Sequence, residues 1–261
     1  MGGFFLASKT QIDPRLFCVT LIGIALVIAS GCVFNNYIDR DIDSLMERTK
    51  HRVLVQGLMQ PRTAIIYATI LGALGLSLLY FGTNRLTTLL AIIGLLVYVV
   101  AYSLFLKRTS TLGTIIGAIS GAIPPVVGYC AVTNQFDAAA VVLFAILFFW
   151  QMPHFYAISI CRLQDYSAAS IPILPVVKNL RYTKISMLVY TVLFAISALL
   201  PSLYGYAGRV YFVVAAVLGL IWLVICIQGF NADNEITWAR RMFAFSIIAI
   251  TILSIMMIVK S

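Results

Sequence analysis

The stretch LFCVTLIGIALVIASGCVFNNYIDRDID, residues 16–43, decides the fold. It carries no charged residue from Leu16 to Ile38, and aspartates then stand at positions 39, 41 and 43. A helix needs about 20 mostly apolar residues to cross the hydrocarbon core of a bilayer. The first part of the stretch therefore predicts a transmembrane helix over residues 16–38. The second part predicts an acidic end where that helix leaves the membrane.

Apolar runs of this kind recur along the whole chain. Hydrophobic residues make up 62% of the 261 residues and charged residues 10%, whereas a soluble domain carries about 25% charged residues. The period-two alternation of outer-membrane barrels is absent, which leaves helices as the spanning elements. A short apolar stub, Gly2 to Ala7, precedes the first run. We predict an all-α integral membrane protein, a single transmembrane domain over residues 1–261, with eight spans at 16–38, 61–81, 86–106, 112–131, 138–160, 183–204, 210–229 and 241–259.

Most charged residues fall at one end of this predicted bundle. Of the 18 lysines and arginines, those at the opposite end are Lys9, Arg15, Arg85, Arg209 and Lys260. An excess of Lys and Arg marks cytoplasmic loops, so the basic end is predicted to be cytoplasmic and the net charge of +9 needs no nucleic-acid partner. That rule concerns basic residues and gives no reason for acidic residues to gather there. All the aspartates and glutamates except Asp13 and Asp137 nevertheless fall at the basic end. The two long connections there, 39–60 and 161–182, are where we expect the functional site.

Asn35, Asp39 and Asp43 follow one another at intervals of four. Residues four apart on a helix lie on nearly the same face, about one turn from each other. The spacing therefore predicts one row of an amide and two carboxylates, with Asp41 pointing nearly the opposite way. Hard oxygen ligands of this kind suit Mg²⁺, which commonly binds through one or two carboxylates and the phosphate oxygens of a substrate. The alternative is a solvated helix end whose acids pair with the neighbouring Arg40 and with Arg48.

Three bases, Arg48, Lys50 and Arg52, follow the acidic row directly. A guanidinium can bind two phosphate oxygens at once, and an ammonium supplies a point charge. These are the side chains that a metal-bridged diphosphate needs beside it. Ordinary basic residues of a cytoplasmic loop are the alternative for each of them.

The row and the bases after it resemble the first signature of the intramembrane aromatic prenyltransferase superfamily. Tyr102-Ser-Leu-Phe-Leu-Lys-Arg108 resembles that superfamily's cytoplasmic Tyr…Lys-Arg loop. Three further stretches resemble one branch, the protoheme IX farnesyltransferases: GAIPPVVGY at 121–129, WQMPHF at 150–155 and DYSAASIPILPVVK at 165–178. The resemblance extends from the stub to about residue 259.

This resemblance implies a nine-helix bundle with a central cavity under a cytoplasmic cap. It also implies a reaction in which farnesyl diphosphate, water and a vinyl group of haem B give haem O and diphosphate, assisted by Mg²⁺. Haem O would then serve a terminal oxidase, directly or after conversion by a haem A synthase. The family's first helix is missing from this chain except for the stub, so eight spans are expected here.

By the same resemblance, Asp165 stands where the superfamily has its second acidic motif, and we expect it to help hold a second Mg²⁺. That motif usually has two or more aspartates four apart, whereas Cys161 and Ala169 flank Asp165 here. The diphosphate is expected to meet Arg48, Lys50, Arg52, Lys107, Arg108 and Arg162. The catalytic residues are expected to be the carboxylates that hold Mg²⁺, namely Asp39, Asp43 and Asp165.

His154 is the one histidine inside a predicted span. A lone histidine within a membrane is a functional candidate, and imidazole is a common axial ligand of haem iron. We therefore expect His154, with Trp150 and Gln151, to position haem B. The alternative is a hydrogen bond between helices close to Pro153.

Other predictions concern packing and the haem propionates. Arg162, Lys178, Arg181 and Lys184 either meet these carboxylates or are ordinary loop charge. The Gly117-xxx-Gly121 spacing predicts close helix packing. Pro124 and Pro125 are expected to break or kink their span.

Three competing functions share some of these features. A sister prenyltransferase for a quinone-type acceptor would share the diphosphate site and differ in the acceptor. A transporter would place charged groups near the middle of the membrane and often shows internal repeats, neither of which this sequence has. A non-catalytic, haem-carrying oxidase assembly factor is the third. The expected location is a bacterial inner membrane, with the site loops in the cytoplasm.

Overall fold

The computed structural model describes residues 1–8 and 12–258, so Lys9 and Lys260 lie outside the described residues. Among those described there is no strand, and eight helices are long and apolar enough to cross a membrane. They are α2 (Pro14–Ile38), α4 (Pro61–Gly82), the continuous run of α5 (Arg85–Leu96), η1 (Val97–Leu106) and α6 (Lys107–Thr109), then α7 (Gly113–Thr133), α8 (Ala138–Cys161), α11 (Leu180–Leu203), α12 (Arg209–Gln228) with η2 (Gly229–Asn231), and α13 (Glu235–Met256). The prediction of a multi-pass, all-helical membrane protein with eight spans is confirmed.

One predicted boundary is wrong by several residues. The apolar pattern predicts the last span at 241–259, but α13 begins at Glu235, where Asn234 caps it by accepting a hydrogen bond from Thr237 N. Arg240 and Arg241 therefore lie inside the helix. Apolar content marks the part of a helix that sits in lipid, and a polar first turn outside the lipid leaves no such signal.

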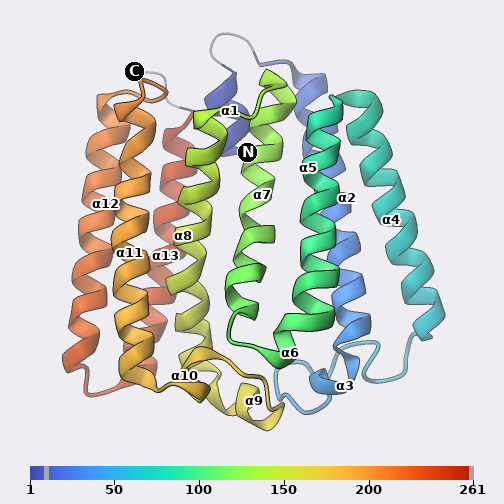
Figure 1. The fold of residues 1–261 in the computed structure, drawn as a ribbon, viewed down its shortest axis with the longest axis vertical. Helices are drawn as coiled ribbons and strands as arrows, with labels where there is room; N and C mark the ends of the chain where they lie inside the picture. The colour runs from blue at the N-terminus through green and yellow to red at the C-terminus, as the bar shows by residue number, and fades with distance from the viewer. Residues whose placement is uncertain (9–11, 259–261) are drawn as a thin grey trace.

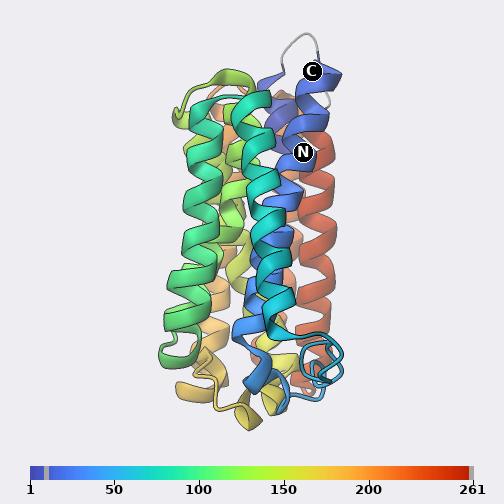
Figure 2. The same cartoon turned by 90° about the vertical axis from the view of Figure 1, so that its right-hand side faces the viewer.

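Long helices run side by side in the bundle (Figures 1 and 2). Small residues let some of them approach closely. Where α2 meets α4, a Cβ added to Gly75 would lie 2.8 Å from Gly23 O. Ser30 Oγ donates to Ala68 O across the same contact, at 2.7 Å. Small residues at helix contacts are typical of membrane bundles, because lipid offers no hydrophobic drive for helices to associate. Large apolar side chains such as Phe81 are correspondingly exposed on the outside.

Four short helices gather at one end of the bundle, the lower end in Figure 1. They are α3 (Arg40–Asp43), α6, α9 (Leu163–Ala168) and α10 (Leu174–Val177). Ile42 and Met46 of the first long connection pack against Ala169, Ile171 and Ile173 of the second. The two connections that the sequence marked for function thus form one joint cap on the bundle. At the opposite end α1 (Gly2–Ala7) packs along α7.

Pro124 and Pro125 do not break α7, which was one of the two effects expected of them. The helix is unbroken from Gly113 to Thr133 across both prolines. A Cβ on Gly117 would lie 3.3 Å from the ring of Tyr102, and one on Gly121 would lie 2.0 Å from Gln151 Oε1. These two glycines therefore make room for side chains of the neighbouring helices, an aromatic ring and an amide.

Candidate active site

The row of Asn35, Asp39 and Asp43 shares one face although the helix is interrupted within it. α2 ends at Ile38, Asp39 caps it, and α3 begins at Arg40. Bonds from Asp39 N to Asn35 O and from Asp43 N to Asp39 O, both 2.8 Å, keep the four-residue register across the interruption. The three residues are only 8%, 0% and 2% exposed. The row is thus held away from bulk water at the end of the bundle.

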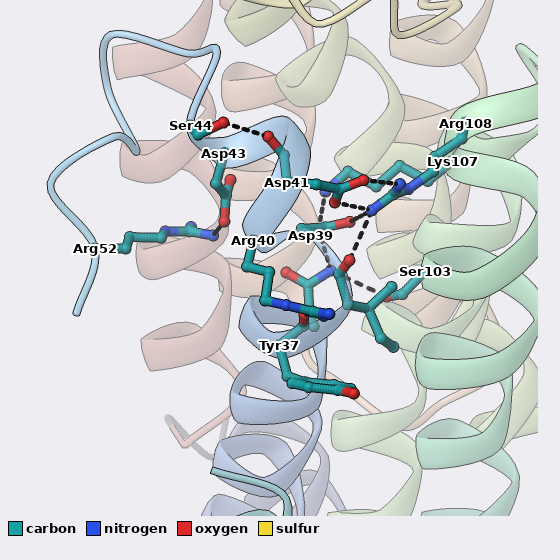
Figure 3. A network of polar contacts seen from close by, with 12 residues as sticks. Tyr37, Asp39, Arg40, Asp41, Asp43, Ser44, Arg52, Ser103, Lys107 and Arg108 are labelled. Atoms are coloured by element: carbon teal, nitrogen blue, oxygen red, sulfur yellow. Dashed lines mark hydrogen bonds and ion pairs between the residues drawn. The ribbon is translucent and has the colours of Figure 1, made fainter. Parts of the chain in front are cut away.

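Each aspartate at this helix end is paired with a base from elsewhere in the chain (Figure 3). The pairs are Asp39 with Lys107, Asp41 with Arg108 and Asp43 with Arg52. Both oxygens of Asp41 accept from Arg108 at 2.6 Å, which is the two-pronged geometry that makes such pairs strong. Arg40 lies over the Tyr37 ring, 4.4 Å from its centroid. The solvated end with acids paired to Arg40 and Arg48 is therefore not what the chain forms.

The run α5–η1–α6 supplies the partners of the row. η1 is a π-helix, and such segments often mark functional sites because they change which side chains face a neighbour. Ser103 lies fully buried there and accepts a hydrogen bond from Asn35 Nδ2 at 3.0 Å. One turn further, Lys107 reaches Asp39. Tyr98 and Tyr102 stack with ring centroids 5.7 Å apart.

The oxygen atoms that Asn35, Asp39 and Asp43 can offer to a metal indicate which metal the row suits. Asp39 Oδ1 is buried and, among the described residues, has no hydrogen-bond partner; the nearest cation in an ion pair is Arg108 Nη2 at 3.8 Å. Within residues 1–8 and 12–258 no three His, Cys, Asp or Glu side chains cluster closely enough to hold a metal. An amide and two carboxylates suit Mg²⁺ that takes its remaining ligands from substrate and water. They do not suit a metal enclosed by protein alone.

Asp165 lies on α9 and connects the two long loops. Its Oδ1 accepts a hydrogen bond from Glu47 N at 3.0 Å. In the described part of the chain it forms no three-carboxylate group with Asp39 and Asp43. Its role at a second Mg²⁺ stays a prediction.

A cavity of about 630 Å³ opens at this end of the bundle. Cations from four different segments line it, and aromatic rings lie among them. The cations are Arg48, Lys107, Arg162 and Arg240, and the rings are those of Tyr98, Tyr102, Phe155, Tyr166 and Phe243. A volume of this size is typical of a small-molecule site.

A second cavity, of about 370 Å³, lies deeper between α2, α5, α7 and α8. Its walls are largely apolar, with Ile24, Val27 and Ile123 among them. Three residues, Tyr98, Gly117 and Phe155, line both cavities. A basic chamber therefore adjoins an apolar one across a shared aromatic wall.

Of the six bases expected at the diphosphate, four make ion pairs with acids and three line the larger cavity. Arg52, Lys107 and Arg108 pair with the three aspartates, and Lys50 pairs with Glu47 at 2.6 Å. Arg48 and Arg162 line the cavity and make no ion pair within residues 1–8 and 12–258. Lys107 belongs to both groups, since it lines the cavity while pairing with Asp39.

The residues expected at the haem lie on α8, where Trp150 and His154 face α13 and Gln151 faces α7. His154 Nδ1 is 2.7 Å from Ser246 Oγ, and the ring stacks on Trp150 at 4.7 Å and contacts Phe243 at 4.8 Å. This is the interhelical hydrogen bond that was the alternative for His154. Gln151 is 4% exposed, donates to Ala118 O at 3.1 Å and lines the deeper cavity.

Hydrogen bonds and burial shift the pKa values of three groups outside the membrane spans, Asp41, Glu47 and Tyr166. Hydrogen bonds from Arg108 lower the pKa of Asp41 to about 2. The hydrogen bond from Lys50 lowers the pKa of Glu47. Burial raises the pKa of Tyr166, which therefore stays a neutral phenol at the cavity. Asp41 and Glu47 are anions at neutral pH.

A comparison with protein families identifies the chain. Residues 1–248 match the model of the UbiA prenyltransferase family. The chain belongs to the UbiA prenyltransferase family.

Curated relatives narrow the resemblance within the UbiA family. The chain is 57% identical over 257 residues to the protoheme IX farnesyltransferases of Cronobacter sakazakii and Serratia proteamaculans, and 56% identical to that of Yersinia pseudotuberculosis. Each alignment covers 98% of this chain and 87% of the relative. The resemblance to the protoheme IX farnesyltransferase branch is confirmed.

Solved structures of the UbiA fold are also similar. A structure described as digeranylgeranylglyceryl phosphate synthase has a TM-score of 0.81 at 21% identity, covering 98% of this chain and 89% of its own. A UbiA homolog from Archaeoglobus fulgidus bound to GPP and Mg²⁺ has a TM-score of 0.72 at 16% identity, covering 98% and 92%. At these identities the likeness shows a shared fold.

Tyr98, Arg240 and Phe243 are among the residues of this UbiA-family cavity that the sequence analysis does not single out. Tyr98 lies one turn before the Tyr…Lys-Arg loop, and its spacing of four from Tyr102 was the available signal. Phe243 and Arg240 come from α13, whose start was misplaced. Only the packing of α13 against α8 brings them to the site.

Proposed function

We propose that this chain transfers the farnesyl group of farnesyl diphosphate to a vinyl group of haem B, with addition of water, and that the reaction requires Mg²⁺. The observation that carries the proposal is a buried Asn–Asp–Asp row beside a basic intramembrane cavity that opens to an apolar one. The names of the relatives at 56–57% identity support the acceptor. We further propose that residues 1–261 act as one transmembrane domain.

Asn35, Asp39 and Asp43 would hold one Mg²⁺, with Asp39 Oδ1 as the oxygen that lacks a partner among the described residues. Asp165 would contribute from the cap. When bound there, Mg²⁺ would supply positive charge to the diphosphate leaving group. In the absence of substrate the same carboxylates are neutralised by Lys107 and Arg52. When the diphosphate arrives, Lys107 can turn to its oxygens, because Lys107 lines the cavity as well as pairing with Asp39.

Arg48, Lys107 and Arg162 are the best placed of the expected bases to bind the diphosphate, since they line the cavity. Arg108, Lys50 and Arg52 would act mainly by holding acids and the loop in place. Cations fixed in advance where negative charge develops stabilise a transition state without reorganisation. The chain's own residues thus provide a preformed site for the leaving group.

The farnesyl tail would lie in the deeper, apolar cavity, with its reactive carbon near the wall of Tyr98, Gly117 and Phe155. The carbon–oxygen bond breaks and its electron pair leaves with the diphosphate. Aromatic faces stabilise the allylic cation, and the apolar walls keep water from capturing it early. The vinyl carbon of haem then bonds to the farnesyl carbon. Water adds a hydroxyl to the resulting cation beside the porphyrin and loses a proton.

His154, Trp150 and Gln151 would position the haem. His154 lines neither of the two cavities, and its bond to Ser246 is a contact between helices. Its ring contacts with Phe155 and Phe243 support the role, because those two rings line the larger cavity. Replacing His154 with Ala should alter the Soret band of bound haem. An unchanged band would remove His154 as a ligand to iron.

One incubation tests the function. Purified protein in detergent or nanodiscs is mixed with haem B, farnesyl diphosphate and Mg²⁺, and the pigments are analysed by mass. Haem O is the expected product. Prenylation of a quinone-type aromatic acid instead would favour the sister activity, and haem binding without conversion would favour a non-catalytic carrier.

We also propose a bacterial inner membrane as the location, with the cap in the cytoplasm. The basic residues gathered at that end support this orientation. A downstream haem A synthase or terminal oxidase would receive the product.

A further inference from the structure

The arginines that line the larger cavity come from three separate parts of the chain. Arg48 follows the acidic row, Arg162 caps the end of α8, and Arg240 lies in the second turn of α13. All three are exposed at the cavity, and within residues 1–8 and 12–258 none of them makes an ion pair. Arg240 therefore has a full charge available for an anionic ligand.

The surroundings of Arg240 differ from those of the acidic row. One turn deeper on the same face of α13 is Phe243, which lines the cavity and contacts the His154 ring. Three residues further along α13 is Ser246. Its Oγ forms a hydrogen bond with His154 Nδ1, and its backbone O accepts one from Trp150 Nε1. Three residues along a helix rise about 4.5 Å. The α13 side of the larger cavity therefore carries a cation, Arg240, and within one or two turns along the helix it carries aromatic rings.

Such a wall matches a flat apolar molecule with an anionic edge. Haem B carries both propionates on one side of its ring and its vinyl groups on the pyrroles away from them. The diphosphate already has cations close to the acidic row, on the side of Lys107. Lys184, an earlier candidate for the propionates, instead donates to Glu235 Oε1 and to Gly229 O, both at 2.6 Å, and is 6% exposed.

Resting on the proposed function, we propose that Arg240 binds a propionate of the haem acceptor and thereby sets which edge of the ring enters the cavity. A guanidinium matches the two oxygens of a carboxylate. With a propionate at the mouth and the ring against Phe243 and Phe155, the vinyl side faces the wall shared by the two cavities. That wall is where the farnesyl carbon is proposed to lie.

The test compares Arg240→Gln with Arg241→Gln, since the neighbouring arginine is also exposed and does not line the cavity. Three quantities are measured on each purified protein: the Kd of haem B by absorbance titration, and the KM values for haem B and for farnesyl diphosphate. Haem B dimethyl ester, which lacks the propionate charges, is titrated in parallel.

We expect Arg240→Gln to weaken haem binding about tenfold, the size of one exposed charge-assisted hydrogen bond. Its KM for farnesyl diphosphate should stay unchanged, and it should bind haem and the diester about equally. Wild type and Arg241→Gln should both prefer haem over the diester, and Arg240→Lys should recover part of the loss.

Two results would overturn this assignment while leaving the enzymatic function intact. One is an Arg240→Gln protein that matches Arg241→Gln in all three quantities. The other is a raised KM for farnesyl diphosphate with normal haem binding, which would assign Arg240 to the leaving group. If wild type converts no haem, the proposed function fails, and the titrations still decide whether Arg240 recognises haem carboxylates.

Discussion

Replacing Asp39 with Asn removes one negative charge from the centre of the acidic row and changes little else in size. Asp39 is fully buried, and its partner Lys107 is 16% exposed in its side chain. The variant loses a charge-assisted hydrogen bond, which is about 1.5–3 kcal/mol when fully buried. Because Lys107 can reach the cavity instead, we expect a stability loss near the lower value, about 1–2 kcal/mol.

Turnover should fall much further than stability. Losing one preorganised charge-stabilising group typically costs about a hundredfold to a thousandfold in kcat, or about 3–4 kcal/mol of the barrier. The assay is haem O formation per folded protein, below the melting temperature of each variant. Asp41→Asn is the matched control. Its carboxylate is also ion-paired, to Arg108, but is 62% exposed in its side chain, so we expect turnover within about threefold of wild type and a stability loss below about 1 kcal/mol.

Two outcomes would refute the reasoning. Asp39→Asn could keep more than about a third of wild-type turnover, against the loss expected for a charge-stabilising group. Alternatively, Asp41→Asn could lose as much as Asp39→Asn, which would mean that any acid at this helix end matters equally.

Three more predictions follow from the packing and the charges. Gly121→Ala should lower stability by about 1–3 kcal/mol in thermal unfolding, since its Cβ would lie 2.0 Å from Gln151 Oε1; an unchanged melting temperature would contradict the packing. Lys184→Met should destabilise by about 1–3 kcal/mol without raising the KM for haem, because Lys184 pairs with Glu235; a selective rise in that KM would contradict this. The stabilisation from Asp41 should be constant from pH 5 to 8 and be lost only as pH falls from about 4, its unfolded pKa, through about 2, its folded pKa. The check is the difference in melting temperature between wild type and Asp41→Asn. A difference that varies between pH 5 and 8 would contradict the pH prediction.

The spans could be predicted because lipid demands long apolar helices with few alternatives. The common face of Asn35, Asp39 and Asp43 could be predicted because backbone bonds keep the register across Asp39. Both features depend on residues close together in sequence, where helical geometry alone determines the neighbours.

What the sequence could not show depends on distant parts of the chain. Asp41 and Arg108 are 67 residues apart, and no local pattern pairs them. The π-helix that brings Ser103 to Asn35 has no simple periodicity to reveal it. Arg240 reaches the cavity only because α13 packs against α8, and a polar first turn hid the start of that helix.

The central claim is that the acidic row binds a divalent ion together with a prenyl diphosphate. The direct measurement is electron paramagnetic resonance of Mn²⁺ added to the purified protein with a non-ionising farnesyl diphosphate analogue. We predict bound Mn²⁺ that requires the analogue, is lost in Asp39→Asn and persists in Asp41→Asn. Equal Mn²⁺ binding by wild type and Asp39→Asn, with the analogue present, would contradict the account.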